Sequence, residues 1–207
     1  MRNAFALVTL IVAPTLAFAQ GTVVFQNLTG QVKQWTSATD PTLVAVSSLV
    51  ELIAAPSGTP LTHPLGTLDA QGFHLAYPTE EAFLAANPVW TAWGVAVAGS
   101  RAPGYFNSGT ASLASIPGGA SADYIIVGWL STAPHLDAAI AGGAFIGESA
   151  VFTTTTGDPS TIPPGLAVSL KSTFTGMTLA PQVVPEPSIF KLAGLGAVVL
   201  MLFRRRS

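Results

Sequence analysis

Residues 124–130 read Tyr-Ile-Ile-Val-Gly-Trp-Leu and are apolar throughout. A short apolar run bounded by turn-forming residues is typical of a strand that is covered on both faces. The run therefore predicts a strand with packed structure on either side of it.

Residues 90–98 carry the second clear strand signal, which is an alternating pattern of side chains. In an extended strand, successive side chains point to opposite faces. The pattern predicts two faces, one formed by Trp93, Val95 and Val97 and the other by Ala92, Gly94, Ala96 and Ala98.

Further short strands are predicted between breaks that are rich in Gly, Pro, Ser and Thr. They cover residues 22–25, 43–54, 111–116, 149–156, 166–170 and 173–179, of which the last two are expected to form a closing pair. Turns are expected at residues 56–58 and 117–119, which read Pro-Ser-Gly and Pro-Gly-Gly.

Helical signal is confined to two short segments. Thr79 is suited to cap a helix over residues 80–86, whose first turn carries two acidic side chains. Residues 136–141 are expected to form a second helical turn that ends at a pair of glycines. A parallel α/β sheet would need longer helices between its strands. The chain is therefore predicted to be all-β, with an antiparallel β-sandwich of Ig-like or jelly-roll type over residues 20–182.

Composition excludes several classes of partner and chemistry. The chain has 207 residues, of which 9% are charged, and it has no cysteine. It therefore has no disulfides, thiolate metal sites or cysteine nucleophiles. Residues 20–184 contain three Lys or Arg and nine Asp or Glu, which gives a formal charge of 3 − 9 = −6. A domain with so few cations is unsuited to a row of phosphates, so we expect no nucleic-acid partner.

The first 19 residues have the pattern of a secretory signal peptide. Arg2 supplies a positive start, residues 4–12 are apolar, and Ala17-Phe18-Ala19 has small residues at the two positions read by signal peptidase. We expect cleavage after Ala19. The alternative interpretation is a buried N-terminal helix.

Residues 183–207 contain three segments in a fixed order. Pro185-Glu186-Pro187 comes first, a mostly apolar stretch follows over residues 189–203, and Arg204, Arg205 and Arg206 follow it. The stretch predicts one transmembrane helix, and the arginines predict a cytoplasmic stop, so that the β domain faces outward. Fifteen residues rise only about 22 Å against a hydrocarbon core of about 30 Å, which suits a temporary anchor.

This tail resembles the PEP-CTERM sorting signal, in which a Pro-Glu-Pro motif precedes an apolar helix and an arginine cluster. The resemblance implies membrane retention after export, recognition by an exosortase as partner, and removal of the tail near Pro185, Glu186 and Pro187. It also implies a role at the cell surface or outside the cell, in association with exopolysaccharide and biofilm. An ordinary C-terminal tail anchor is the alternative.

The sequence offers weak signals for catalysis or metal binding. His63, His74 and His135 have no close ligand spacing, so we expect no metal and no cofactor. Paired carboxylates such as Glu51 and Glu148 would be needed by a glycan hydrolase. Their spacing in the chain does not indicate whether they meet in the fold.

Aromatic side chains are the strongest signal for binding. Tyr105 and Phe106, in a loop flanked by glycine, form a possible carbohydrate-binding pair, because aromatic faces suit the apolar faces of sugar rings. Core packing is the alternative role for these rings. The leading hypothesis is a non-catalytic exported surface or matrix protein, and the alternatives are an extracellular carbohydrate-binding module and a sandwich-fold glycan hydrolase.

Overall fold

The structure, a computed structural model, describes residues 20–35, 41–43, 48–62, 79–99 and 102–181. The predicted signal peptide and the whole tail from residue 183 lie outside the described residues, and so does the predicted transmembrane helix. Within the described part of the chain, no helix is long and apolar enough to span a bilayer.

Eleven strands and three short helices follow one another along the described chain. They are β1 (Gln20–Gln26), β2 (Val32–Trp35), β3 (Pro41–Leu43), β4 (Ser48–Pro56), α1 (Glu80–Ala86), β5 (Thr91–Ala98), β6 (Asn107–Pro117), β7 (Ser121–Leu130), α2 (Leu136–Ala141), β8 (Ile146–Glu148), β9 (Phe152–Thr155), β10 (Val168–Ser169), the 3₁₀ turn η1 (Leu170–Ser172) and β11 (Met177–Leu179).

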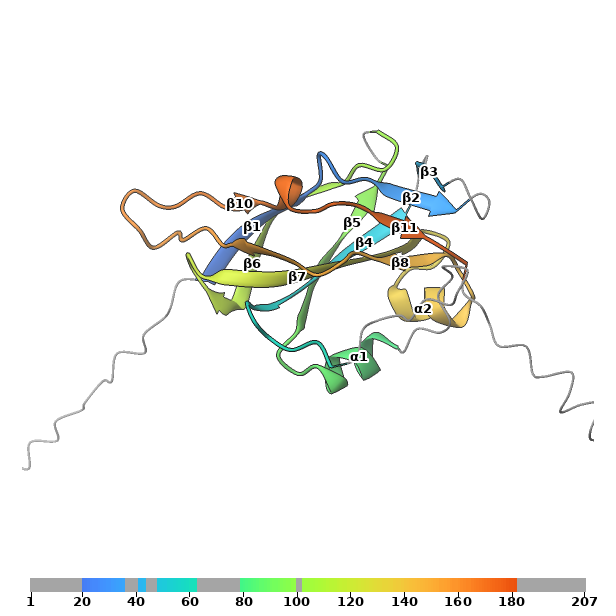
Figure 1. Cartoon of the computed structure of the whole chain (residues 1–207), viewed down its shortest axis with the longest axis horizontal. Helices are drawn as coiled ribbons and strands as arrows, with labels where there is room; N and C mark the ends of the chain where they lie inside the picture. The colour runs from blue at the N-terminus through green and yellow to red at the C-terminus, as the bar shows by residue number, and fades with distance from the viewer. Residues whose placement is uncertain (1–19, 36–40, 44–47, 63–78, 100–101, 182–207) are drawn as a thin grey trace, which may run out of the picture.

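The strands form three sheets (Figure 1). The largest has the order β5-β4-β7-β8, with β9 also paired to β7. The other two have the orders β10-β1-β6 and β11-β2-β3. The described chain consists mostly of strands with few helical residues, which confirms the all-β prediction. Most strand pairs are antiparallel, as predicted, but β10 pairs with β1 and β11 pairs with β2 in parallel.

The expected closing pair is therefore wrong. Residues 166–170 and 173–179 contain β10 and β11, which belong to different sheets. The 3₁₀ turn between them explains the difference, because the buried side chain of Leu170 fixes it in the core. The chain leaves β1 at this turn and continues beside β2.

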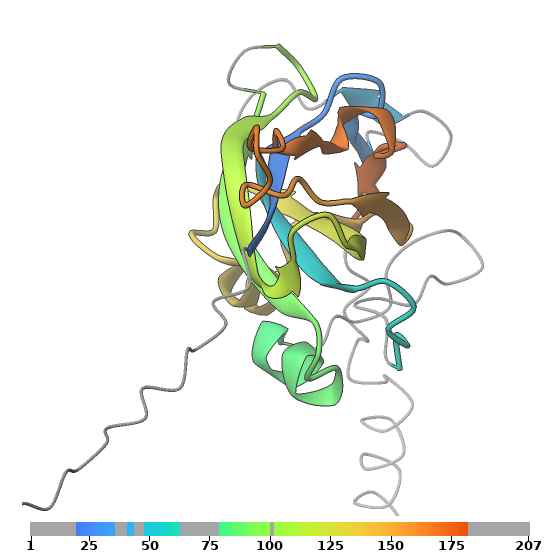
Figure 2. The same ribbon diagram turned by 90° about the vertical axis from the view of Figure 1, so that its left-hand side faces the viewer.

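Strand β7 is covered on both faces, as its sequence predicts. Its inner face, which includes Tyr124 and Ile126, packs against side chains of β1, β6 and β11. Its outer face, which includes Ile125 and Trp129, packs against the side chains of α1 and α2. Figure 1 shows α1 and α2 on one side of the molecule and β1, β2, β10 and β11 on the opposite side, and Figure 2 shows the same layers from the end.

Gly128 leaves room for a side chain of β11 where β7 meets that strand. A Cβ at Gly128 would clash with the Met177 methyl group, and it would also lie 3.2 Å from Leu179 Cδ2. The gap in the apolar run of β7 is therefore filled by a side chain from β11, which closes the inner core at this point.

The two predicted helices are confirmed. The Thr79 hydroxyl accepts a hydrogen bond from Ala82 N at 3.2 Å and caps α1. His135 Nδ1 accepts one from Ala138 N at 3.1 Å and caps α2.

Two strand predictions had wrong bounds. The long strand expected over residues 43–54 begins at Ser48, while Leu43 belongs to β3, and the strand expected over 149–156 is β9 alone, preceded by β8.

The faces of β5 differ from the predicted alternation because the strand contains a β-bulge. Glu51 of β4 pairs with Val95, and the next residue, Leu52, pairs with Trp93, so Gly94 has no partner of its own. Its φ of 62° is the left-handed conformation that glycine permits. As a result Trp93 shares the inner core with Ala96 and Ala98, while Val95 and Val97 lie exposed.

Replacing Gly94 with alanine tests this bulge. An added Cβ would meet no atom within 4 Å, so the substitution acts through the backbone alone. We expect Gly94→Ala to lower the free energy of unfolding by about 1 kcal/mol in urea denaturation. Gly94→Asn should lose less, since asparagine tolerates the left-handed region. A Gly94→Ala protein as stable as the parent would contradict the bulge.

Candidate functional site

The two residues of the predicted carbohydrate-binding pair differ in exposure, because Phe106 is buried and Tyr105 is only partly buried. Phe106 is 2% exposed, and its ring centroid lies 4.9 Å from that of Phe25 and 5.7 Å from that of Phe174. Core packing, the alternative role, therefore describes Phe106. Its buried faces are already in contact with aromatic neighbours.

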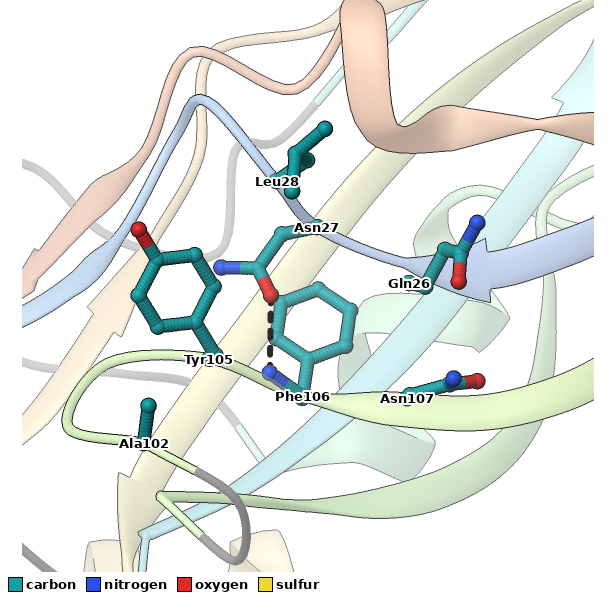
Figure 3. Close-up of a pocket in the computed structure, with 7 residues that line it drawn as sticks. All are labelled: Gln26, Asn27, Leu28, Ala102, Tyr105, Phe106 and Asn107. Carbon is teal, nitrogen blue, oxygen red and sulfur yellow. Dashed lines mark hydrogen bonds between the residues drawn. The ribbon is translucent and has the colours of Figure 1, made fainter.

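Tyr105 lies at a surface hollow of about 280 Å³ (Figure 3). Its side chain is partly buried, and its hydroxyl accepts a hydrogen bond from Gln31 Nε2 at 2.8 Å. The hollow is lined by Gln26, Asn27, Leu28, Ala102, Tyr105, Phe106 and Asn107. Phe106 contributes to its wall without offering a free ring face.

The Asn27 amide organises this region. Its Nδ2 donates to Gly30 O at 2.6 Å and to Gly104 O at 2.9 Å, while its Oδ1 accepts from Phe106 N at 2.7 Å. Figure 3 shows the last of these bonds between the end of β1 and the start of β6. Asn27 is 6% exposed, so it joins two segments far apart in the chain from inside the fold.

A second hollow, of about 310 Å³, lies along the seam where β5 and β6 approach each other. Among the described strands, β5 pairs only with β4, and β6 pairs only with β1, so no ladder of hydrogen bonds closes this seam. The hollow is lined by Phe25, Ala92, Trp93, Gly94, Ser108, Gly109, Thr110, Ala111 and Ser112.

Trp93 differs from the other tryptophans in the two cores. The indole N–H of Trp90 donates to Pro60 O at 3.3 Å, and that of Trp129 donates to Ala133 O at 3.1 Å. The Trp93 Nε1 is also buried, but it has no hydrogen-bond partner in the part of the chain that the structure describes. Of these three rings, Trp93 is the one that lines a hollow.

Three carboxylates meet on the outer face of the largest sheet. Glu51 on β4 is 8% exposed, and its burial, together with the nearby charges of Glu80 and Asp137, raises its pKa from 4.5 to about 7. Burial and Asp137 also raise the pKa of Glu80, while His135 opposes that shift. Asp137 Oδ1 accepts a hydrogen bond from Glu80 N at 2.7 Å, which links the starts of α1 and α2.

The hydrolase hypothesis needs a carboxylic acid beside a carboxylate. Glu51 and Glu148 both lie opposite Val127, on the strands either side of β7, so the fold brings this predicted pair to the same register. Glu51 has the raised pKa that a general acid uses near neutral pH. Its side chain, however, is buried beside α1 and α2, and both hollows described above lie elsewhere.

Most of the remaining predicted site residues lie outside the part of the chain that the structure describes. His135 caps α2, whereas His63 and His74 lie outside the described residues. Within the described ranges, no group of three or more His, Cys, Asp or Glu side chains is placed to hold a metal ion. The signal-peptidase residues Ala17 and Ala19, the motif Pro185, Glu186 and Pro187, and the cluster Arg204, Arg205 and Arg206 all lie outside the described part of the chain.

Comparison of the chain with protein-family models, with curated proteins and with solved structures gives no match.

Replacing Asn27 with alanine tests its role as a clamp. The change would remove the hydrogen-bond partners of Phe106 N and Gly30 O in a buried site, at a cost of about 1–3 kcal/mol for each group that water cannot reach, while Gly104 O would keep its bond from Val32 N. We expect the free energy of unfolding to fall by roughly 3 kcal/mol in urea denaturation. The control is Asn107→Ala, whose exposed amide makes one local bond to Gly109 N, and it should cost well under half as much. Equal losses in the two variants would contradict the clamp.

Glu51 makes a pH-dependent contribution to stability. Because its pKa is higher in the folded state, the fold binds this proton more tightly than the unfolded chain does, so the contribution is complete below pH 4.5 and is lost as the pH rises through about 7. We expect Glu51→Gln to match the parent at about pH 4 and to exceed its free energy of unfolding by roughly 2 kcal/mol at pH 8.

Urea denaturation at several pH values would measure this difference. The control is Glu81→Gln, since Glu81 is exposed on the same helix α1 as Glu80. A difference between Glu51→Gln and the parent that does not change with pH would show that Glu51 keeps its ordinary pKa.

Proposed function

We propose that the chain is a non-catalytic exported protein of the cell surface or extracellular matrix, which is sorted and processed by an exosortase. The observation that carries the proposal is the order of the three C-terminal segments. Pro185-Glu186-Pro187 precedes an apolar stretch, and the cluster Arg204-Arg205-Arg206 follows it. This order supports a membrane helix whose cationic end stays in the cytoplasm.

The end of the β domain supports the same proposal. Ala180 N donates to Ile146 O at 2.9 Å, and Ile146 N donates to Ala180 O at 3.0 Å. Met177 and Leu179 of β11 are buried in the inner core just before this bridge. The fold therefore holds the chain firmly a few residues before the motif, so that removal of the tail would leave the described core intact.

The proposal includes the finer fold assignment and the location. The β domain would be a sandwich of Ig-like or jelly-roll type, held first at the membrane by its C-terminus and afterwards at the surface or outside the cell. Its partners would be the exosortase and the membrane, with exopolysaccharide as the surrounding polymer. The layered packing of the largest sheet against the other two is favourable to a sandwich.

Replacing Pro185, Glu186 and Pro187 with alanine tests the sorting signal. In the native host we expect the variant to remain in the membrane fraction at the mass of the unprocessed protein, because the exosortase would no longer recognise its tail. Fractionation and intact-mass measurement would follow both forms. The matched control replaces the neighbouring Gln182, Val183 and Val184 with alanine, and its processing should continue. Normal release of the motif variant would sink the proposal.

A further inference from the structure

The seam between β5 and β6 is an opening between two sheet edges. Both strands are edge strands among the described elements, so backbone N–H and C=O groups on their facing sides are not used in a ladder. Phe25, which is 2% exposed, also lines the hollow. The seam thus combines an apolar side chain with polar backbone edges.

Trp93 adds a donor without an acceptor. A buried N–H that lacks a partner destabilises the free protein, because it has left water without gaining an acceptor. The Trp93 Nε1 is such a group among the described residues, and the ring that carries it lines the hollow. A ligand with an apolar face beside its hydroxyl groups would cover the accessible part of this ring, and its oxygens would accept from the buried Nε1 only after the side chain rotates toward the hollow.

The edges disfavour a peptide strand as the occupant. The bulge at Gly94 interrupts the regular spacing of β5, and Gly109 on β6 has a φ of 80°. Bulged edges are a common way in which proteins prevent the addition of another strand. Ser108, Thr110 and Ser112 are exposed along the other side of the hollow, and their hydroxyl groups suit a polyhydroxylated ligand.

The lack of positive charge at the hollow disfavours an anionic ligand. None of the described residues that line the hollow is charged, and residues 20–184 carry a formal charge of −6. An anionic polymer would be repelled at long range and would find no cation in the hollow. The hollow, at about 310 Å³, is at the small end of ligand sites.

The geometry points to a binding site for a neutral glycan in the hollow between β5 and β6, with Trp93 as the ring on which a sugar stacks. The inference rests on the proposed function only for the presence of the polymer outside the cell. It moves the aromatic contact from the predicted pair Tyr105 and Phe106 to Trp93. The ring of Phe106 remains part of the core.

Affinity electrophoresis of the purified full-length chain in mild detergent tests this site independently of export and processing. Native gels would contain a soluble β-glucan, galactomannan or xylan as neutral probes, and alginate as the anionic probe. We expect retardation by at least one neutral polymer and none by alginate. Trp93→Phe, which keeps an aromatic ring and loses the N–H, should weaken the retardation about tenfold.

A second variant keeps the inference testable if Trp93→Phe disturbs folding. Ser108→Trp adds a large ring at an exposed position of the hollow and should abolish retardation. Ser115→Trp, also exposed on β6 but outside the hollow, should leave the retardation unchanged.

The site would be overturned if no neutral polymer retards the protein, if alginate alone retards it, or if Ser108→Trp leaves the retardation unaffected. Self-association that Ser108→Trp abolishes, without retardation by a neutral polymer, would assign the seam to a second copy of the chain and would also overturn it. Failure of the sorting signal would alter none of these gels.

Discussion

Burial of β7 on both faces is the constraint on which the rest of the structure depends. A strand with apolar side chains on alternate sides cannot leave either face in water, so a layer must cover each one. Strands β1, β6 and β11 cover the inner face, and helices α1 and α2 cover the outer face. The buried rings of Tyr124 and Trp129 on opposite faces show how much apolar area each layer removes from water.

The same constraint explains the two short helices, which have little stability of their own. Helices of six or seven residues are too short to persist in water without tertiary contacts. Phe83 of α1 and Leu136 of α2 are completely buried against β4 and β7, and the bond from Glu80 N to Asp137 Oδ1 joins the two helices at their starts. This junction places Glu80 and Asp137 close enough to Glu51 to raise its pKa, so the acidic cluster is a consequence of how the outer face is covered.

Local patterns in the sequence predicted the elements better than they predicted the connections between them. The apolar run at 124–130, the cap at Thr79 and the glycine pair after residue 141 each act within a few residues, and all three predictions were confirmed. The parallel pairs β1·β10 and β2·β11 depend on contacts between segments more than a hundred residues apart, which no local pattern encodes. The face of Trp93 was assigned wrongly for a similar reason, because an alternating pattern cannot reveal that Gly94 occupies a bulge.

At the candidate sites, too, the sequence predicts local features better than contacts between distant segments. The sequence predicted Tyr105 and Phe106 as a binding pair, but it could not show that Phe106 is held in the core by Phe25 and Phe174. A signal for Trp93 was present in the glycine that follows it, since a glycine within a strand often marks a bulge. A bulge at an edge changes which side chains turn inward and also leaves the edge unable to accept another strand. The bulge that moves Trp93 to the inner side therefore also leaves the seam beside it unpaired among the described strands.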